Sequence, residues 1–115
     1  MQIHKWANTA IAAVDANKAS TELKNDARAL PTMLRELHVL NTLLFYNNKT
    51  VEDILKKEIQ NYLSNQIEDP IFSIPKLNII ESYALLMHCN GFAVELKRYA
   101  NAMIQDVTSQ TNNTE

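Results

Sequence analysis

Glycine is nearly absent from this sequence, which holds one glycine and three prolines in 115 residues. Sheets and barrels need frequent tight turns, and those turns draw on glycine and proline. The scarcity therefore argues against an all-β fold and predicts long helices joined by few loops. It also excludes a phosphate-binding loop of the glycine-rich kind.

Cysteine and net charge are limited as well. Cys89 is the only cysteine, so an internal disulfide is impossible, which suits a reducing cytoplasm. The N-terminus MQIHKWANTA has no secretory pattern, and no apolar run reaches the length of a membrane span. We therefore expect a cytoplasmic protein without a membrane partner. The net charge of −2 does not indicate nucleic-acid binding, so a binding face requires clustered basic residues.

What the sequence does contain is helical periodicity. Its apolar fraction of 46% falls into stripes with the i, i+3, i+4 spacing of amphipathic helices. We expect an all-α fold, a compact bundle of about four to six helices that forms one domain over residues 1–105. The polar tail, residues 106–115, is expected to be disordered. The predicted helices cover residues 2–17, a segment from Ser20 or Thr21 to Phe45, a segment from Thr50 to Leu63, and residues 76–105.

Three residues predict where these helices begin, bend or end. Pro31 either kinks a long helix or opens a new one at its first turn. Thr50 follows a turn-like segment and is expected to cap the next helix. Gly91 either ends the last helix or marks the close approach of another helix, and we prefer the second interpretation. Residues 64–75 are expected to form a loop whose apolar side chains reach the core.

No set of residues in the sequence assembles a catalytic or metal site. His88 and Cys89 are adjacent, and consecutive helical residues point about 100° apart, so they do not converge on one metal. The acid pairs Glu52–Asp53 and Glu68–Asp69 are sequence neighbours too, and the first suits the positive end of a helix dipole. We therefore expect no enzyme, no metal and no cofactor, with Cys89 packed as a small hydrophobe.

Basic residues give the strongest candidate for a binding surface. Lys24, Arg28 and Arg35 fall within roughly 40° of one another on a continuous helix. Such a stripe can track a phosphate backbone. The alternative is a solvated face whose charges pair with neighbouring acids. Lys97 and Arg98 are a second pair of basic residues, for which the same two interpretations stand.

Two motifs carry a resemblance to a known family. The first motif is Leu30-Pro31, Met33, Arg35 and Thr42-Leu43-Leu44-Phe45, and the second is the run LKRYANA, residues 96–102. With these motifs the chain resembles the small helical subunit of the Cmr (type III-B CRISPR) RNA-guided complex, the fifth protein of that set. The likeness covers most of residues 5–104. Two positions depart from it, because the family tends to have glycine where His38 stands and tryptophan where Glu95 stands.

The resemblance implies a noncatalytic subunit of an antiviral, RNA-targeting complex. Copies of such subunits stack beside the backbone nuclease subunits and face the duplex of guide RNA and target RNA. Cleavage and second-messenger synthesis belong to other subunits, among them the polymerase-like large subunit. The residues implied to contact RNA phosphates, without reading sequence, are Lys24, Arg28, Arg35, Lys97 and Arg98.

Three other functions stay open. One is a protein-only helical adaptor, in which apolar side chains of residues 33–45 face a partner helix. Another is the equivalent small subunit of the type III-A complex, which has the same role in a different assembly. The third is a small enzyme with a site in its core. Salt-dependent RNA binding within an assembled complex separates the first of these from the subunit hypothesis.

Overall fold

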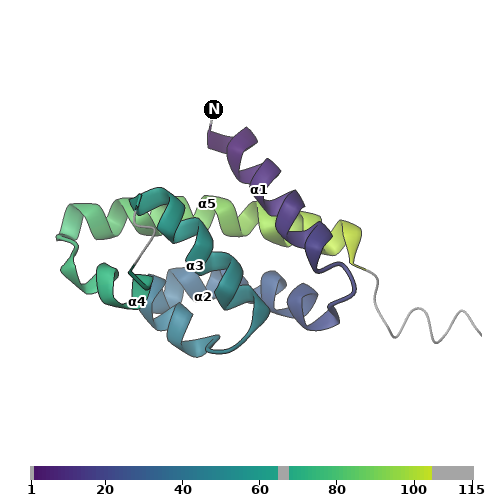
Figure 1. Ribbon diagram of the computed structural model, residues 1–115, viewed down its shortest axis with the longest axis horizontal. Helices are drawn as coiled ribbons and strands as arrows, with labels where there is room; N and C mark the ends of the chain where they lie inside the picture. Colours follow the sequence, from purple (N-terminus) through teal and green to yellow (C-terminus); the bar gives the residue numbers. More distant parts are fainter. Residues whose placement is uncertain (1, 65–67, 105–115) are drawn as a thin grey trace, which may run out of the picture. The chain divides into compact units, whose positions relative to one another are not determined.

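The computed structural model describes residues 2–64 and 68–104, and these ranges are helical, with no strand among them (Figure 1). The all-α prediction is confirmed. The tail predicted to be disordered lies outside the described residues. The helices are α1 (Gln2–Ala16), α2 (Thr21–Phe45), α3 (Thr50–Leu63), α4 (Pro70–Ser73), a 3-10 helix (Ile74–Lys76) and α5 (Ile79–Met103).

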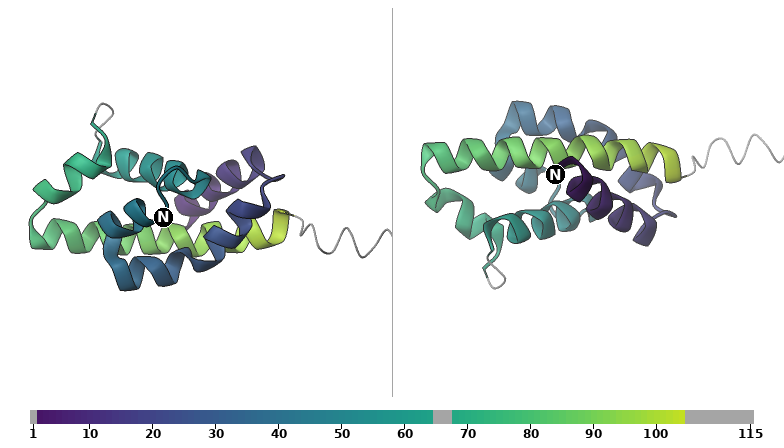
Figure 2. Two further views of the ribbon diagram at one scale, coloured as in Figure 1. Left: turned by 90° about the horizontal axis from the view of Figure 1, so that it is seen from below. Right: turned by 90° about the horizontal axis from the view of Figure 1, so that it is seen from above.

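The chain divides into two compact units whose borders fall inside helices. The first unit comprises residues 1–31 and 92–115, so it holds α1, the start of α2 and the end of α5. The second unit comprises residues 32–91 and holds the rest of α2 and α5 with everything between them. Figure 2 shows α2 and α5, which contribute to both units, from two further directions. The single domain over residues 1–105 stays a prediction.

The first unit has its own apolar core. Ser20 opens α2 as predicted, because its hydroxyl oxygen accepts a hydrogen bond from the backbone N–H of Leu23 at 3.0 Å and so satisfies one free donor of the first turn. The apolar side chains of α1, α2 and α5 then recur at helical spacing. The fully buried ones are Ala10, Val14, Leu23, Ala27, Leu30, Phe92, Ala93, Leu96 and Ala100.

The second unit buries apolar side chains from every helix it contains, including Pro70 of the short α4. The predicted loop over residues 64–75 is wrong from Pro70 onward, where α4 and the 3-10 helix follow each other. Asp69 caps α4 by accepting the Ile71 N–H at 3.0 Å, and Pro70 occupies the first turn, where its missing N–H costs nothing. The buried side chains include Leu34, Val39, Leu43, Val51, Leu55, Ile59, Ile74, Leu85 and Cys89.

The break in α2 is at His38. The prediction that Pro31 opens a new helix is wrong, and the alternative, a kink at Pro31, stays a prediction. Pro31 lies inside the helix, whereas His38 has φ 64° and ψ −178°. A proline removes one hydrogen bond of a helix, but a residue outside the helical region changes the direction of the chain. The break therefore falls after Arg35.

The structure tests three other helix ends. Lys49, not Thr50, occupies the N-cap position of α3, and no side chain caps it there. Asn78 and Glu81 instead form a reciprocal cap at the start of α5, with hydrogen bonds of 2.8 and 2.9 Å, so that helix begins later than predicted. Gly91 lies inside α5 without a positive φ, so it does not end the helix.

Candidate nucleic-acid interface

Charge is distributed unevenly between the two units. Residues 1–31 and 92–105 hold six Lys or Arg against four Asp or Glu, whereas residues 32–91 hold five against seven. Residues 106–115, which also belong to the first unit, add two acids. The whole first unit is therefore balanced, with a surplus of positive charge over residues 1–31 and 92–105, and the second unit is acidic. Because phosphate binding depends on a local surplus of positive charge, the first unit is the better candidate for contact with RNA.

Four of the five predicted RNA-binding residues belong to the first unit. Lys24 and Arg28 lie on α2 at the i, i+4 spacing that places two side chains on one face, and Lys97 and Arg98 lie on α5. Lys24 is partly buried and the other three are exposed. Within residues 2–64 and 68–104, ion-pair partners are absent for Lys24, Arg28 and Lys97. Their charges are thus available to an anionic ligand.

Glu95 reduces the positive charge at one of these positions. Its carboxylate is buried, at 6% exposure, and lies 3.5 Å from Nη1 of Arg98. The resemblance predicts a tryptophan here, so this chain has a buried acid where an aromatic side chain is the expected residue. Arg98 is therefore partly neutralised, and Lys97 is the freer cation of that pair.

Arg35 belongs to the second unit, apart from the other four residues. Its side chain is exposed, and Nη2 donates a hydrogen bond to the Thr32 hydroxyl at 3.3 Å. The stripe of Lys24, Arg28 and Arg35 includes residues of both units, so its action as one surface stays a prediction.

Sequence reasoning missed a buried polar contact in the second unit. Nε2 of His88 lies 2.6 Å from Oε2 of Glu58, both side chains are under 10% exposed, and the Tyr62 ring lies 4.3 Å from the His88 ring. A signal was present, because Glu58 interrupts the apolar spacing of Ile54, Leu55 and Ile59. The contact ties α3 to α5 in the interior, and we interpret it as structural.

A second polar group joins α3 to α4. Nζ of Lys56 lies 3.1 Å from Oδ2 of Asp69 and 3.5 Å from Oε2 of Glu52. Burial lowers the pKa of Lys56, but its hydrogen bond to Asp69 and the two negative charges outweigh burial and raise the pKa overall. The Ile71 N–H, followed by Lys56, holds the pKa of Asp69 below its ordinary value. The ammonium of Lys56 is thus held between two carboxylates, so this group offers no positive charge to a phosphate.

Cys89 has the environment of a packing residue. The thiol is free and buried, and burial, with a smaller contribution from Glu58, raises its pKa above its ordinary value. A raised pKa disfavours the thiolate, which is the reactive form. In the described ranges, no group of three or more His, Cys, Asp or Glu side chains is placed to hold a metal ion. The same ranges contain no helix with the length and apolar character of a membrane span.

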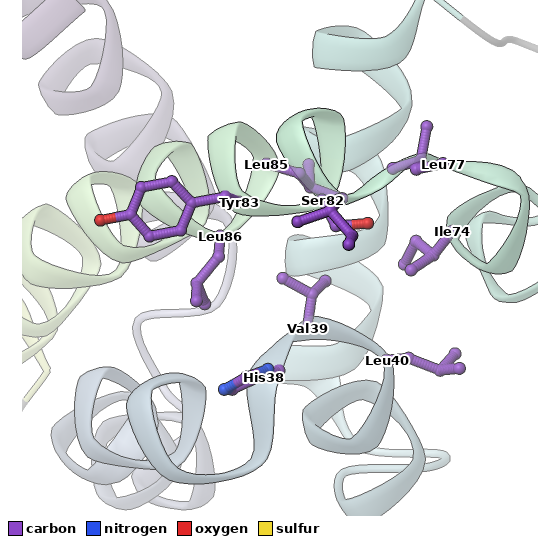
Figure 3. Close-up of a pocket in the computed structure, with 10 residues that line it drawn as sticks. His38, Val39, Leu40, Ile74, Leu77, Ser82, Tyr83, Leu85 and Leu86 are labelled. Carbon is purple, nitrogen blue, oxygen red and sulfur yellow. The ribbon is translucent and has the colours of Figure 1, made fainter.

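A cavity of about 410 Å³ opens in the second unit between the later part of α2 and the start of α5 (Figure 3). Val39 from α2 and Leu86 from α5 extend into the space between these helices. His38, at the break in α2, and Tyr83, on α5, also line it. Its mainly apolar walls do not suit a phosphate, so we do not count the cavity among the candidate RNA-binding residues.

The described residues define a small all-helical protein with exposed basic residues on α2 and α5 and no assembled catalytic group among them. Its fold is similar to that of a CRISPR-associated Cmr5 family protein from Thermus thermophilus, solved by X-ray crystallography. The TM-score is 0.75 at 18% identity, covering 91% of this chain and 99% of that chain. The family resemblance carried by the two sequence motifs is thus confirmed at the level of the fold. No protein-family model and no curated protein matches the sequence.

Proposed function

We propose that this chain is the noncatalytic small subunit of a type III-B CRISPR complex that targets RNA. The observation that carries the proposal is the Cmr5-like fold over 91% of the chain, joined to two sequence motifs that resemble the same family. In this role the protein works in the cytoplasm. Its partners are the backbone nuclease subunit, the polymerase-like large subunit, other copies of itself and the guide–target RNA duplex.

The proposed mechanism is electrostatic. Lys24, Arg28 and Lys97 place unpaired positive charge on helices of the first unit, and Arg98 adds to it. Arg35 contributes a further charge from the second unit. Lys and Arg contacts to phosphates position a duplex without reading its sequence, so sequence is read by pairing with the guide. A modest surplus of charge suits a subunit that binds RNA only together with its neighbours.

A second candidate, the protein-only adaptor, is favoured by one observation. Ile79, Ile80, Tyr83 and Met87 are all more than half exposed at the start of α5, and contiguous exposed apolar side chains mark protein contacts. An adaptor needs this surface and does not need the basic residues. Charge reversal of the basic residues should therefore weaken RNA binding if the chain is the RNA-facing subunit, and should have no such effect if it is an adaptor.

The test is target-RNA capture by a reconstituted complex that contains this chain, measured at several salt concentrations. We expect the Lys24→Glu/Arg28→Glu variant to weaken capture by about tenfold or more and to lower the salt slope by roughly one unit for each phosphate interaction that the substitutions remove. Lys97→Glu and Arg35→Glu, tested singly, are expected to lower the slope by about one each. The fold should persist, because surface substitutions cost little stability.

The matched control is Lys5→Glu/Lys18→Glu, which makes the same change in net charge within the same unit. Both lysines are exposed and lie outside the predicted set. If every variant captures target RNA with the same affinity and the same salt slope as this control, the RNA-facing role is contradicted and the adaptor is favoured.

A further inference from the structure

The cavity between the later part of α2 and the start of α5 has the size of a small-molecule site. Its volume of about 410 Å³ falls within the range of about 300–1,000 Å³ that is usual for ligand pockets. Val39 and Leu85 line it and are both buried, so the cavity extends to the core of the second unit. Core side chains normally leave few voids larger than a water molecule, so a cavity of this size beside a core indicates a binding site.

Two polar side chains, one from each of the helices that flank the cavity, determine which ligands it can bind. His38 comes from α2 and Ser82 from α5 (Figure 3). Within residues 2–64 and 68–104, neither the imidazole ring of His38 nor the hydroxyl of Ser82 has a hydrogen-bond partner. A hydroxyl both donates and accepts, and a neutral imidazole donates from one ring nitrogen and accepts at the other. The cavity therefore offers both donors and acceptors to one ligand.

The walls of the cavity carry no fixed charge. Its lining, which lies wholly within the described ranges, contains no Asp, Glu, Lys or Arg side chain. Most of the remaining walls are aliphatic, among them Ile74, Leu77 and Leu86. An ion moved into such surroundings loses its hydration without gaining a counter-charge. The cavity therefore selects an uncharged and mainly apolar ligand.

The break in α2 is an independent observation that points to the same site. Three consecutive residues, His38, Val39 and Leu40, all line the cavity. On a regular helix, consecutive side chains point about 100° apart, so three in a row do not line one cavity. The φ of 64° and ψ of −178° at His38 make this arrangement possible, and residues held in such rare conformations cluster at ligand-binding sites.

We propose that this cavity binds a small uncharged molecule with an apolar body and a polar head that both donates and accepts hydrogen bonds. A primary carboxamide has this chemistry, because its carbonyl oxygen accepts and its NH₂ group donates. The head bonds to His38 and Ser82, and the apolar body packs against Val39, Leu85 and Leu86. Since His38 reaches the cavity through the break in α2, binding favours the broken form of that helix. The site goes beyond the proposed function and does not depend on it.

NMR titration of the isolated full chain with hexanamide tests the proposal, at about pH 8, where imidazole groups are ordinarily uncharged. We expect saturable shifts in the amide signals of the residues that line the cavity, with a Kd of roughly 0.1–1 mM for so small a ligand. Hexanoate and hexylammonium have a similar apolar body with a negative or a positive head. Each should bind at least about tenfold more weakly than hexanamide, because the cavity provides no counter-charge.

Two substitutions remove the polar groups of the cavity without weakening the fold. Ser82→Ala removes the hydroxyl and leaves a good helix former, and His38→Gly removes the imidazole at a position where glycine fits the backbone. Each should weaken hexanamide binding by about three- to tenfold, which corresponds to the loss of one hydrogen bond. Asn41→Ala, at an exposed residue of α2 outside the cavity, is the matched control and should bind as the wild type does.

Three results would each overturn the proposal. The first is a wild-type chain whose cavity signals do not shift or do not saturate with hexanamide. The second is equal affinity for hexanamide, hexanoate and hexylammonium. The third is binding by Ser82→Ala and His38→Gly that equals binding by the control. Target-RNA capture, which tests the proposed function, is measured on other residues and is decided separately.

Discussion

His38 holds a backbone conformation that side chains disfavour. Its φ of 64° and ψ of −178° fall in a region occupied almost only by glycine, at a cost of about 1–3 kcal/mol. The Thr42 hydroxyl, fully buried, lies 2.6 Å from the His38 carbonyl oxygen and 3.1 Å from that of Met33. The hydroxyl therefore links the residue at the break to the turn before it, so the break is supported by a side chain four residues later.

His38→Gly is therefore expected to stabilise the protein. Glycine relieves the strain. Its greater freedom in the unfolded chain offsets about 0.5–1 kcal/mol of this stabilisation, so we expect a net increase of roughly 1 kcal/mol in the free energy of unfolding. Urea unfolding at neutral pH measures it. Asn41→Gly, in the helical part of α2 that follows, is the control and should destabilise by about 0.5 kcal/mol. A loss of stability in His38→Gly contradicts the assigned strain.

Asp69 makes stability depend on pH in the acid range. Its pKa is lowered in the folded state, first by the Ile71 N–H and then by Lys56. A lowered pKa contributes stability above the unfolded value of 3.8, and this contribution is lost as the pH falls through the folded value. We expect Asp69→Asn to cost about 0.5–1 kcal/mol at pH 7, because the side chain is partly exposed.

The measurement is the difference in unfolding free energy between wild type and Asp69→Asn at a series of pH values. The difference should be constant above about pH 5 and shrink toward zero below the folded pKa of Asp69. Asp53→Asn, at an exposed ion pair with Lys57, is the control and should show a smaller difference. A difference that does not change with pH rules out the carboxylate as its source.

At the scale of elements, the Glu58–His88 contact holds α3 against α5 inside the second unit. Removing one partner from a buried pair leaves the other polar group without its bond, which costs about 2–4 kcal/mol. Replacing both partners with apolar side chains of similar volume is often neutral. Removing one partner of the pair should therefore cost more stability than replacing both partners with apolar side chains.

We accordingly expect Glu58→Leu to lower the free energy of unfolding by about 2–4 kcal/mol and the double variant Glu58→Leu/His88→Phe to recover most of that loss. Chemical denaturation of the two single variants and the double variant completes the cycle. Additive losses in the double variant would show that the two side chains do not interact.

The existence of the long helices could be predicted from sequence, but not all their breaks. Apolar spacing located α1, α2, α3 and α5 because a helix buries one face whatever its neighbours are. Pro31 gave a strong local signal and proved compatible with a helix. His38 gave a signal only through the family, which tends to have glycine at this position, because histidine itself indicates no break. The cap at Asn78 and Glu81 was visible as an Asn-x-x-Glu spacing and was overlooked.

At the scale of the molecule, the basic residues could be located by sequence but not assigned to a surface. Lys97 and Arg98 are more than sixty residues from Arg28, and only the fold places them in the same unit. The charge distribution was hidden for the same reason, since the positive surplus of residues 1–31 and 92–105 emerges only after distant segments are combined. The sequence shows Glu95 as a departure from the family, but it does not show that this side chain is buried.

The single domain predicted over residues 1–105 requires the two units to unfold together. Two helices, α2 and α5, run across the border between them, and interrupting a helix in its middle loses hydrogen bonds on both sides. We expect one cooperative transition, with the calorimetric enthalpy equal to the van't Hoff enthalpy. Two resolved transitions, or a ratio of calorimetric to van't Hoff enthalpy well above one, show that the units are separate domains.

The two units also carry one natural reporter each. Trp6, the only tryptophan, belongs to the first unit, and Cys89, the only thiol, is buried in the second. Intrinsic fluorescence excited at the indole thus follows the first unit, while the rate of reaction with a thiol reagent follows the opening of the second. Unfolding of the unmodified chain can therefore be measured by tryptophan fluorescence and by thiol labelling in parallel, and each signal reports on one known unit of the protein.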